Sequence, residues 1–392
     1  MAQDGDEVVE TTETSWLGRL GQSVGGVLVG IVLILGACVL LFWNEGRAVK
    51  TARSLSEGAG IVKSVPADSV DPANDGKLIH LMGTLSTGGP AIDEEFGVKG
   101  SGVRLVRRVE MFQWTENSQS ETTKKLGGGE TTRTVYKYTR AWSDQPVDSA
   151  KFHERDGHAN PQMTWRSRST YARQVKLGAF AVPDDLLRNF GSPVAVPATE
   201  AQAAELARRL GKPVQAVDGV LYIGGDPGQP AVGDFKVVFS EVQAQPATIV
   251  ADQMGAALVP YRARAGGTVE LIEPGAVPAA DMFKDAQSEN RMWSWLIRAG
   301  GAVLMFFGFA FVMNPLKVLA DVVPFLGDVV GVGVGLMAFL CTVVLAPLVI
   351  AIAWFVYRPL VAAIVLAVAA AVAYGVIHFS RRQAAGKAPA AT

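Results

Sequence analysis

The sequence predicts an α+β membrane protein. We expect four transmembrane helices, one N-terminal and three C-terminal, with a large β-rich domain inserted between the first and the second. Three observations support this fold class. Hydrophobic residues make up 49% of the 392 residues and charged residues only 19%, below the usual quarter. Long apolar runs are concentrated at the two ends of the chain. The segment between them is polar and contains short runs of alternating apolar and polar residues, which are typical of strands.

The composition also excludes several classes of protein. Lys and Arg total 36 and Asp and Glu total 37, so the net charge is −1 and no global basic field would attract nucleic acid. Cys38 and Cys341 both lie in apolar runs, which rules out a disulfide framework and a cysteine-based zinc site. We therefore predict no nucleic-acid partner, no bound metal and no cofactor.

The apolar runs are long enough, or nearly so, to cross a bilayer core of about 30 Å, which needs about 20 helical residues. After a polar or interfacial segment at 1–23, the predicted transmembrane helices are 24–43, 296–313, 329–357 (kinked at Pro347) and 360–379, and a polar tail follows at 380–392. The first run has no small-residue cleavage site, so we interpret it as an uncleaved anchor rather than a signal peptide. Residues 314–328 mix apolar and charged side chains, which favours a helix lying in the membrane interface over a soluble loop.

Residues 44–295 form the predicted β-rich extracytoplasmic domain. Strands are expected at 78–86, 103–116, 134–143, 214–223, 235–242 and 247–261, and helices at 199–210 and 281–295. Asp218-Gly219 is a hairpin turn signal inside one of these segments. Residues 122–132 contain three consecutive glycines and predict a mobile hairpin loop.

Motifs that would indicate catalysis have simpler structural interpretations. The sequence GQSVG at 21–25 matches the nucleophile-elbow pattern, but no strand precedes it and a membrane helix follows. His153 and His158 have acidic neighbours, but their spacing of five fits no helical zinc site. Within the apolar runs, Arg298 and His378 are the only acidic or basic residues, which argues against ion-coupled transport but not against a passive pore. We therefore predict no catalytic residue and a protein that is not an enzyme.

Two sets of residues are candidates for roles in the membrane. Glycines at small-xxx-small spacing predict close helix packing, either between chains or within one chain: Gly26, Gly30, Gly331 and Gly335. Aromatic and basic residues at the ends of the runs predict anchors in the headgroup layer: Trp43, Arg47, Trp293, Trp295 and Arg358. A minor alternative is a lipid-acting enzyme whose polar residues gather at the same junction, near Asn44, Glu45, Arg47 and Arg358.

Blocks of sequence spread in order over nearly the whole chain follow one family pattern. They are SWLGRLGQSVGGVLVG (15–30), NEGRAVKTARSLSEG (44–58), VDPANDGKLIHLMGTL (70–85), VRRVEMFQWTE (106–116), FHERDGHANP (152–161), VGDFKVVFS (232–240), NRMWSWLIRAGG (290–301) and FVYRPL (355–360). These blocks resemble the transmembrane protein 43 family, also called LUMA. The resemblance implies four membrane helices, with both termini in the cytosol and the inserted domain across the membrane. It supplies no catalytic residues.

For eukaryotic members the resemblance implies the endoplasmic reticulum and inner nuclear membrane, self-association, and complexes with lamins and emerin. The Ala- and Gly-rich composition indicates a bacterial member, for which we expect the cytoplasmic membrane and no lamin or emerin partner. Counting basic residues near the helix ends gives five on each side, so the cytoplasmic position of the termini comes from the resemblance.

The sequence thus predicts a non-enzymatic multipass scaffold that self-associates and assembles membrane protein complexes through its extracytoplasmic domain. Its expected partners are the lipid bilayer, further copies of itself and other membrane proteins. The main alternative is a passive channel, or a channel modulator, formed by the oligomerised helices.

Overall fold

The computed structural model describes residues 6–360, together with 363, 364, 367 and 374. The chain divides into two compact units, which are described separately. The β-rich unit contains Met1–Glu13, Ser54–Thr123 and Thr131–Ala286. The helical unit contains Thr14–Arg53, Lys124–Glu130 and Gln287–Thr392.

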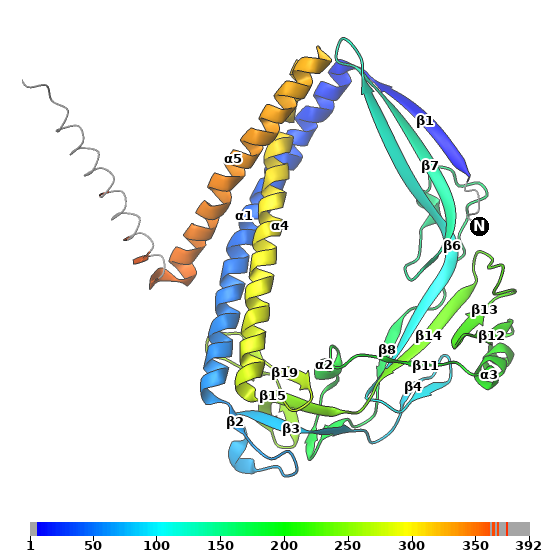
Figure 1. Cartoon of the computed structure of the whole chain (residues 1–392), viewed down its shortest axis with the longest axis vertical. Helices are drawn as coiled ribbons and strands as arrows, with labels where there is room; N and C mark the ends of the chain where they lie inside the picture. The colour runs from blue at the N-terminus through cyan, green and yellow to red at the C-terminus, as the bar shows by residue number, and fades with distance from the viewer. Residues whose placement is uncertain (1–5, 361–362, 365–366, 368–373, 375–392) are drawn as a thin grey trace, which may run out of the picture. The chain divides into compact units, whose positions relative to one another are not determined.

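Three long helices supply the helical unit: α1 (Trp16–Ile61), α4 (Ala279–Ala320) and α5 (Pro324–Tyr357). Among the described residues, these are the helices long and apolar enough to cross a membrane. They lie side by side (Figure 1), and a small core that includes Ala37, Leu41, Met305 and Ala346 joins them. Most of the fourth predicted helix, at 360–379, lies outside the described residues.

The helix boundaries differ from the expected ones in two places. α1 does not end at Trp43 but continues to Ile61. The separate interfacial helix expected at 314–328 is also absent, because α4 runs through Pro315 to Ala320 and α5 begins at Pro324. After Pro315 the helix buries Val318, whereas Leu316 and Leu319 are exposed. Proline suits the first position of α5, because the amide hydrogen it lacks would have no partner inside the helix.

The first sheet of the β-rich unit has the order β1-β7-β6-β14-β13-β12, with β11 added on β14 and β8 on β6. Its strands are β1 (Glu7–Thr14), β6 (Arg104–Lys124), β7 (Glu130–Ser143), β8 (Arg168–Tyr171), β11 (Val194–Val196), β12 (Val214–Val217), β13 (Val220–Ile223) and β14 (Phe235–Val242).

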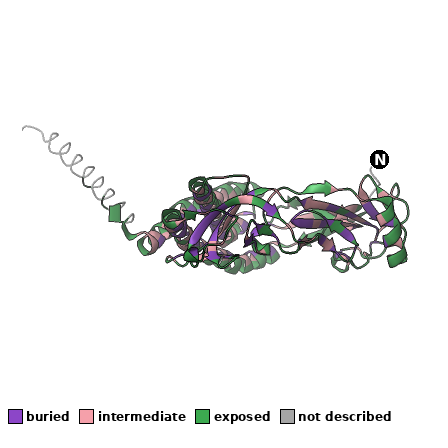
Figure 2. Ribbon diagram, turned by 90° about the horizontal axis from the view of Figure 1, so that it is seen from below, coloured by how far each residue is buried: buried purple, intermediate pink, exposed green. Residues whose placement is uncertain are grey.

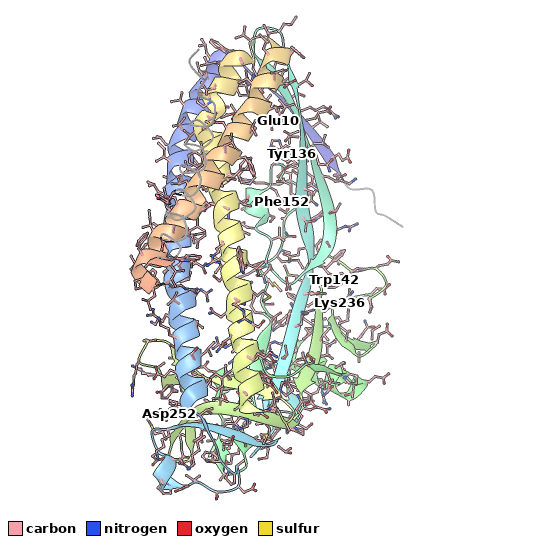
Figure 3. All side chains as sticks on the ribbon, turned by 60° about the vertical axis from the view of Figure 1, so that its left-hand side comes forward. Glu10, Tyr136, Trp142, Phe152, Lys236 and Asp252 are labelled. Carbon is pink, nitrogen blue, oxygen red and sulfur yellow. The ribbon has the colours of Figure 1, made fainter. Side chains whose placement is uncertain are left out.

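Side chains make two contacts between strands of this sheet, and Figure 3 labels the residues involved. The Tyr136 hydroxyl donates to Glu10 on β1, at 3.3 Å. The Lys236 ammonium lies 4.2 Å from the centre of the Trp142 ring.

The second sheet has the order β19-β15-β16-β10-β9-β3-β2, and β15 also pairs with β3. Its strands are β2 (Lys63–Ser64), β3 (Leu78–Ser86), β9 (Lys176–Leu177), β10 (Phe180–Ala181), β15 (Pro246–Met254), β16 (Ala257–Val259) and β19 (Leu271–Pro274). Two further pairs are β4 (Ala91–Asp93) with β5 (Val98–Gly100), and β17 (Tyr261–Arg262) with β18 (Thr268–Val269). Antiparallel β15 and β3 run in register from Pro246 opposite Thr84 to Asp252 opposite Leu78.

Apolar side chains of the strands form the main core of this unit, and Figure 2 shows buried residues concentrated there. A smaller core holds the last turns of α1 and the first turns of α4 against β3 and β15, through Leu55, Met282 and Phe283 among others. Two short helices, α2 (Asp184–Leu187) and α3 (Glu200–Leu210), complete the unit, with 3-10 turns at Pro72–Asn74 and Ser149–Lys151.

Candidate functional site

Two polar clusters lie within the helical unit, one near each end of the apolar part of α1. We name them after one residue each. The Arg19 cluster consists of Arg19, Lys124, Glu130, Asp321 and Asp328. The Glu45 cluster consists of Asn44, Glu45, Arg47, Asn290, Ser294, Arg298 and Trp354.

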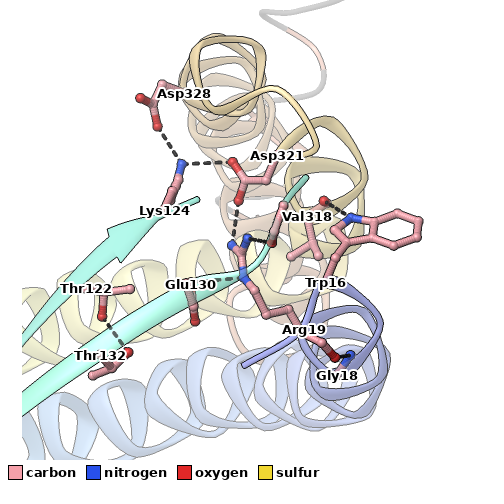
Figure 4. A network of polar contacts seen from close by, with 12 residues as sticks. Trp16, Gly18, Arg19, Thr122, Lys124, Glu130, Thr132, Val318, Asp321 and Asp328 are labelled. Atoms are coloured by element: carbon pink, nitrogen blue, oxygen red, sulfur yellow. Dashed lines mark hydrogen bonds and ion pairs between the residues drawn. The ribbon is translucent and has the colours of Figure 1, made fainter. Parts of the chain in front are cut away.

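The guanidinium of Arg19 is the centre of the first cluster (Figure 4). Its Nη2 lies 2.5 Å from the Oδ2 atom of Asp321, its Nε lies 2.9 Å from Glu130 Oε2, and its Nη1 donates to the Gly128 carbonyl at 2.6 Å. The side chain of Arg19 is 9% exposed and that of Asp321 is fully buried. Hydrogen bonds between ionised groups are stronger than those between neutral groups, and burial shields these from competing water.

Lys124 completes this cluster from the end of β6. Its ammonium lies 2.8 Å from Asp321 Oδ1 and 2.6 Å from Asp328 Oδ1. Burial by itself would raise the pKa of the Asp321 carboxyl, but the hydrogen bonds from Lys124 and Arg19 outweigh burial and hold that pKa below its ordinary value. Burial likewise disfavours the charged form of Lys124, and the two carboxylates overcome it and raise the pKa of the ammonium. Asp321 and Lys124 are therefore both ionised at neutral pH.

The turn that joins β6 to β7 is docked onto the helices by backbone groups as well. The Gly127 amide donates to the Val322 carbonyl at 3.1 Å, and the Trp16 indole donates to the Val318 carbonyl at 2.9 Å. Gly128 has a positive φ of 80°, and a Cβ atom there would collide with the Trp16 ring. Only glycine meets both constraints. The sequence indicated a mobile loop at 122–132, whereas the structure shows strands up to Lys124 and from Glu130, with a docked turn between them.

A cleft of about 210 Å³ opens beside this cluster, between α1 and α4. Gln22 and Ser23 line it from α1, and Asn314 and Lys317 line it from α4. Ser23 is the central residue of the GQSVG motif, and its hydroxyl donates to the Leu20 carbonyl one turn earlier in the same helix. This geometry is that of a helical serine rather than a strand-to-helix nucleophile elbow.

The Glu45 cluster joins all three helices through one carboxylate. Arg298 of α4 donates to Glu45 with Nε at 2.6 Å and with Nη2 at 2.8 Å, and the Trp354 indole of α5 donates at 2.9 Å. Glu45 is fully buried. The bidentate geometry fixes the angle between α1 and α4 as well as their distance.

Amide side chains extend this cluster along α1 and α4. The Asn44 amide donates to the Ser294 carbonyl, and the Asn290 amide donates to the Ala48 carbonyl at 3.0 Å. Arg47 donates to the Asn290 side-chain oxygen at 3.2 Å. Asn44, Glu45 and Arg47, three of the four residues that a lipid-acting enzyme would use at this junction, are therefore engaged in bonds between helices.

The candidate packing glycines occupy different surroundings. An added Cβ at Gly30 would lie 2.6 Å from the Gly308 carbonyl oxygen of α4, so this glycine permits a close crossing within one chain. At Gly26 and Gly331 the nearest described atoms would be Phe311 at 3.7 Å and Lys317 at 3.2 Å. At Gly335 a Cβ would meet no described atom within 4 Å.

The candidate anchors lie on the helices near the Glu45 cluster. Trp43, Trp293 and Trp295 are exposed, and the Arg298 guanidinium lies 4.8 Å from the centre of the Trp295 ring. Arg358 follows α5, and its backbone amide donates to the Trp354 carbonyl. The basic groups Arg19, Lys124 and Arg298 therefore contribute more bonds between segments than the aromatic anchors do.

The two histidines singled out in the sequence pack against aromatic rings of the β-rich unit. His153 is stacked on Tyr136, and His158 is stacked on Tyr138, both with 4.1 Å between ring centres. In the part of the chain that the structure describes, no three His, Cys, Asp or Glu residues are grouped so that they could hold a metal ion.

The helices and the β-rich unit define a class, that of integral membrane proteins with several α-helical spans and a large β-rich region. A family model described as Transmembrane protein 43 matches residues 111–359. Relatives named Transmembrane protein 43 include one from Rattus norvegicus, 33% identical over 372 residues and covering 91% of each chain. Another, from Homo sapiens, is 32% identical over 378 residues, covering 93% of this chain and 92% of the relative.

A more distant relative, Transmembrane protein 43 homolog from Drosophila melanogaster, is 28% identical over 351 residues, covering 86% of this chain and 90% of its own length. The chain belongs to the transmembrane protein 43 family. No solved structure matches it.

Proposed function

We propose that this protein is a non-enzymatic membrane scaffold, which self-associates through α5 and assembles membrane protein complexes through its β-rich domain. The observation that carries self-association is a pair of α5 glycines, Gly333 and Gly335, which lie on opposite sides of the helix and are not covered by the described chain. Added Cβ atoms at Gly333 and Gly335 would meet no described atom within 4 Å. Their neighbours Val332 and Leu336 are exposed apolar residues.

Lipid provides no hydrophobic drive between helices, so association depends on close packing at small residues. The chain already uses this device internally, where Gly30 faces Gly308 and where a Cβ at Gly301 would lie 2.6 Å from Leu41. Gly335 offers the same opportunity on a side of α5 that the described chain leaves open. A second copy of α5 is a partner of matching chemistry and length.

The two polar clusters support a scaffold role as well. Each joins α1 to another segment of the helical unit through a buried ion pair, so the bundle holds a defined shape. A surface of fixed shape loses less conformational entropy on binding than a mobile one, which favours assembly.

The test is the mass of the full-length protein in detergent, measured by light scattering after size-exclusion chromatography. We expect the wild type to be oligomeric and Gly335→Leu to give a smaller particle with an unchanged melting temperature. Gly36→Leu is the matched control, because Gly36 also lies in an apolar helix with no described atom near its Cβ position. A wild-type monomer, or equal masses for all three proteins, contradicts self-association through α5.

A further inference from the structure

We infer that Arg53 of α1 and Arg358, which directly follows α5, bind the phosphate group of an anionic phospholipid where the α5 span ends. The chemistry they recognise is a phosphate with net negative charge, and we assign it to a membrane lipid rather than to a soluble phosphate compound. Both residues belong to the helical unit. The inference does not depend on self-association.

The packing of α5 on α1 brings the two arginines to one place. Arg53 Nη2 donates to the Tyr357 carbonyl oxygen at 2.8 Å, and that carbonyl belongs to the peptide group that joins Tyr357 to Arg358. The Tyr357 ring lies on α1 at Gly46, where an added Cβ would be 2.7 Å from the ring. The guanidinium of Arg53 therefore lies beside the backbone of Arg358, and the contact at Gly46 holds the two helices together there.

Neither arginine has a carboxylate of its own. In the part of the chain that the structure describes, the Arg358 side chain forms no hydrogen bond or ion pair. It interacts electrostatically with Glu45, but both oxygens of that carboxylate already accept from Arg298. Arg53 is exposed, and its bond to a carbonyl leaves most of the five N–H donors of a guanidinium free. The two side chains thus keep donors and positive charge for an external partner.

The surrounding helices supply no further free carboxylate. α1 contains two, Glu45 and Glu57, and the Glu57 carboxylate is bonded within the β-rich unit. In the part of α4 that belongs to the helical unit, Glu289 accepts from the Trp293 indole. After Asp328 the sequence contains no Asp or Glu. The C-terminal part of the chain therefore adds no acidic side chain that could neutralise the two arginines.

The site lies at the level where lipid phosphates are found. The candidate span Phe325–Tyr357 ends immediately before Arg358, and Ile352, Phe355 and Val356 in its last turns are exposed. Headgroups follow directly on the hydrocarbon core at the end of a span. A guanidinium binds phosphate oxygens through two parallel hydrogen bonds. Two such groups favour a headgroup with net negative charge over phosphatidylcholine, in which a quaternary ammonium offsets the phosphate.

The test is lipid binding to the full-length protein, purified in detergent and measured by native mass spectrometry. Phosphatidylglycerol is the anionic lipid, phosphatidylcholine with the same acyl chains is the zwitterionic one, and glycerol 3-phosphate is the soluble phosphate compound. We expect phosphatidylglycerol to bind at least about fivefold more tightly than phosphatidylcholine. Equimolar glycerol 3-phosphate should leave the phosphatidylglycerol bound, because it has no acyl chains to pack against the apolar end of α5.

Substitutions identify the residues that hold the lipid. Arg53→Gln and Arg358→Gln remove one charge each, and each should weaken phosphatidylglycerol binding by about fivefold and phosphatidylcholine binding less. Arg53→Lys and Arg358→Lys keep the charge without the planar pair of donors, so they should weaken binding less than the glutamine variants do. Arg291→Gln is the matched control, because it removes an exposed arginine from α4 of the same unit and should leave the affinity unchanged.

Melting temperatures measured without lipid show first that every variant is folded. Equal affinities for the two lipids, or displacement of phosphatidylglycerol by equimolar glycerol 3-phosphate, overturn the assignment of the ligand. An equal loss of affinity in Arg291→Gln, or no loss in Arg53→Gln and Arg358→Gln, overturns the assignment of the site.

Discussion

A single buried carboxylate, Asp321, connects three segments that are far apart in the sequence. Its two oxygens accept from Arg19 and from Lys124, and these partners are 302 and 197 positions away. A buried charge of this kind is tolerated only while both partners remain, because an unpaired ion in a low-dielectric site is far less favourable than one in water.

Asp321→Asn keeps the size of the side chain and removes its charge. We expect it to lower the free energy of unfolding by about 1–3 kcal/mol, because Arg19 and Lys124 lose their shared buried counter-charge and keep only the more exposed carboxylates of Glu130 and Asp328. Thermal unfolding in detergent measures the loss. Asp328→Asn is the control; its carboxylate is 72% exposed, so its effect stays within about 1 kcal/mol. Equal losses of stability in Asp321→Asn and Asp328→Asn would contradict a larger contribution from the buried carboxylate.

The Asp321 carboxylate also makes the free energy of unfolding depend on pH. The pKa of Asp321 is lowered in the folded protein from the ordinary value of 3.8, so its contribution is present above that value and lost as the pH falls through the lower, folded value. The difference in melting temperature between wild type and Asp321→Asn is therefore constant from pH 5 to 8 and shrinks below about pH 4.

The sequence did not reveal this cluster. Nothing local in the sequence links Arg19 to Asp321, which lies 302 positions later. The capping box of α3 shows the contrast. Thr199 and Gln202 exchange bonds across three positions, and the helix expected at 199–210 lies at Glu200–Leu210. Features made by neighbours in sequence are predictable, whereas those made by tertiary pairing are not.

At the scale of elements, the crossing of α1 and α4 depends on paired glycines. A Cβ at Gly30 would lie 2.6 Å from the Gly308 carbonyl oxygen, and one at Gly308 would lie 3.0 Å from the Gly30 carbonyl oxygen. Both obstacles are backbone atoms, which cannot turn aside as the end of a flexible side chain can. Close contact between the helices therefore requires glycine at both positions.

Gly30→Leu should separate the two helices and lower the free energy of unfolding by at least about 1–3 kcal/mol, the usual effect of overpacking. The mass of the particle should not change, because the contact lies within one chain. Gly25→Leu is the matched control, with no described atom within 4 Å of its Cβ position. Thermal unfolding and light scattering of both variants give the comparison. An unchanged melting temperature for Gly30→Leu would contradict the crossing.

Several strands were predictable because alternation and turn signals are local. The segments expected at 78–86 and 235–242 are β3 and β14, and Asp218-Gly219 joins β12 to β13. β1 was not predicted. Its sequence EVVETTET is acidic and short of apolar residues, and it becomes a strand by pairing with β7, more than 100 residues later.

At the scale of the whole molecule, the Glu45 cluster is where α1, α4 and α5 meet. Glu45→Gln should lower the free energy of unfolding by about 3–5 kcal/mol, because Arg298 loses its counter-charge. Replacing both partners, Glu45→Leu with Arg298→Leu, should recover most of this loss, since no buried charge is then left unpaired. Thermal unfolding of the single and double variants decides the point. A double variant as unstable as Glu45→Gln would contradict the assignment of the loss to the unpaired charge of Arg298.

The pairing of Glu45 with Arg298 also has a consequence for biosynthesis. The uncharged part of the α4 run, 299–313, is shorter than the about 20 residues that a span needs, and the charge of Arg298 directly before it further opposes insertion. Its partner lies 253 positions earlier, on a helix already made by the ribosome. α1 must therefore remain near the insertion machinery until α4 emerges. Integration of this protein into the membrane is a joint event of its first two spans rather than a sequence of independent ones.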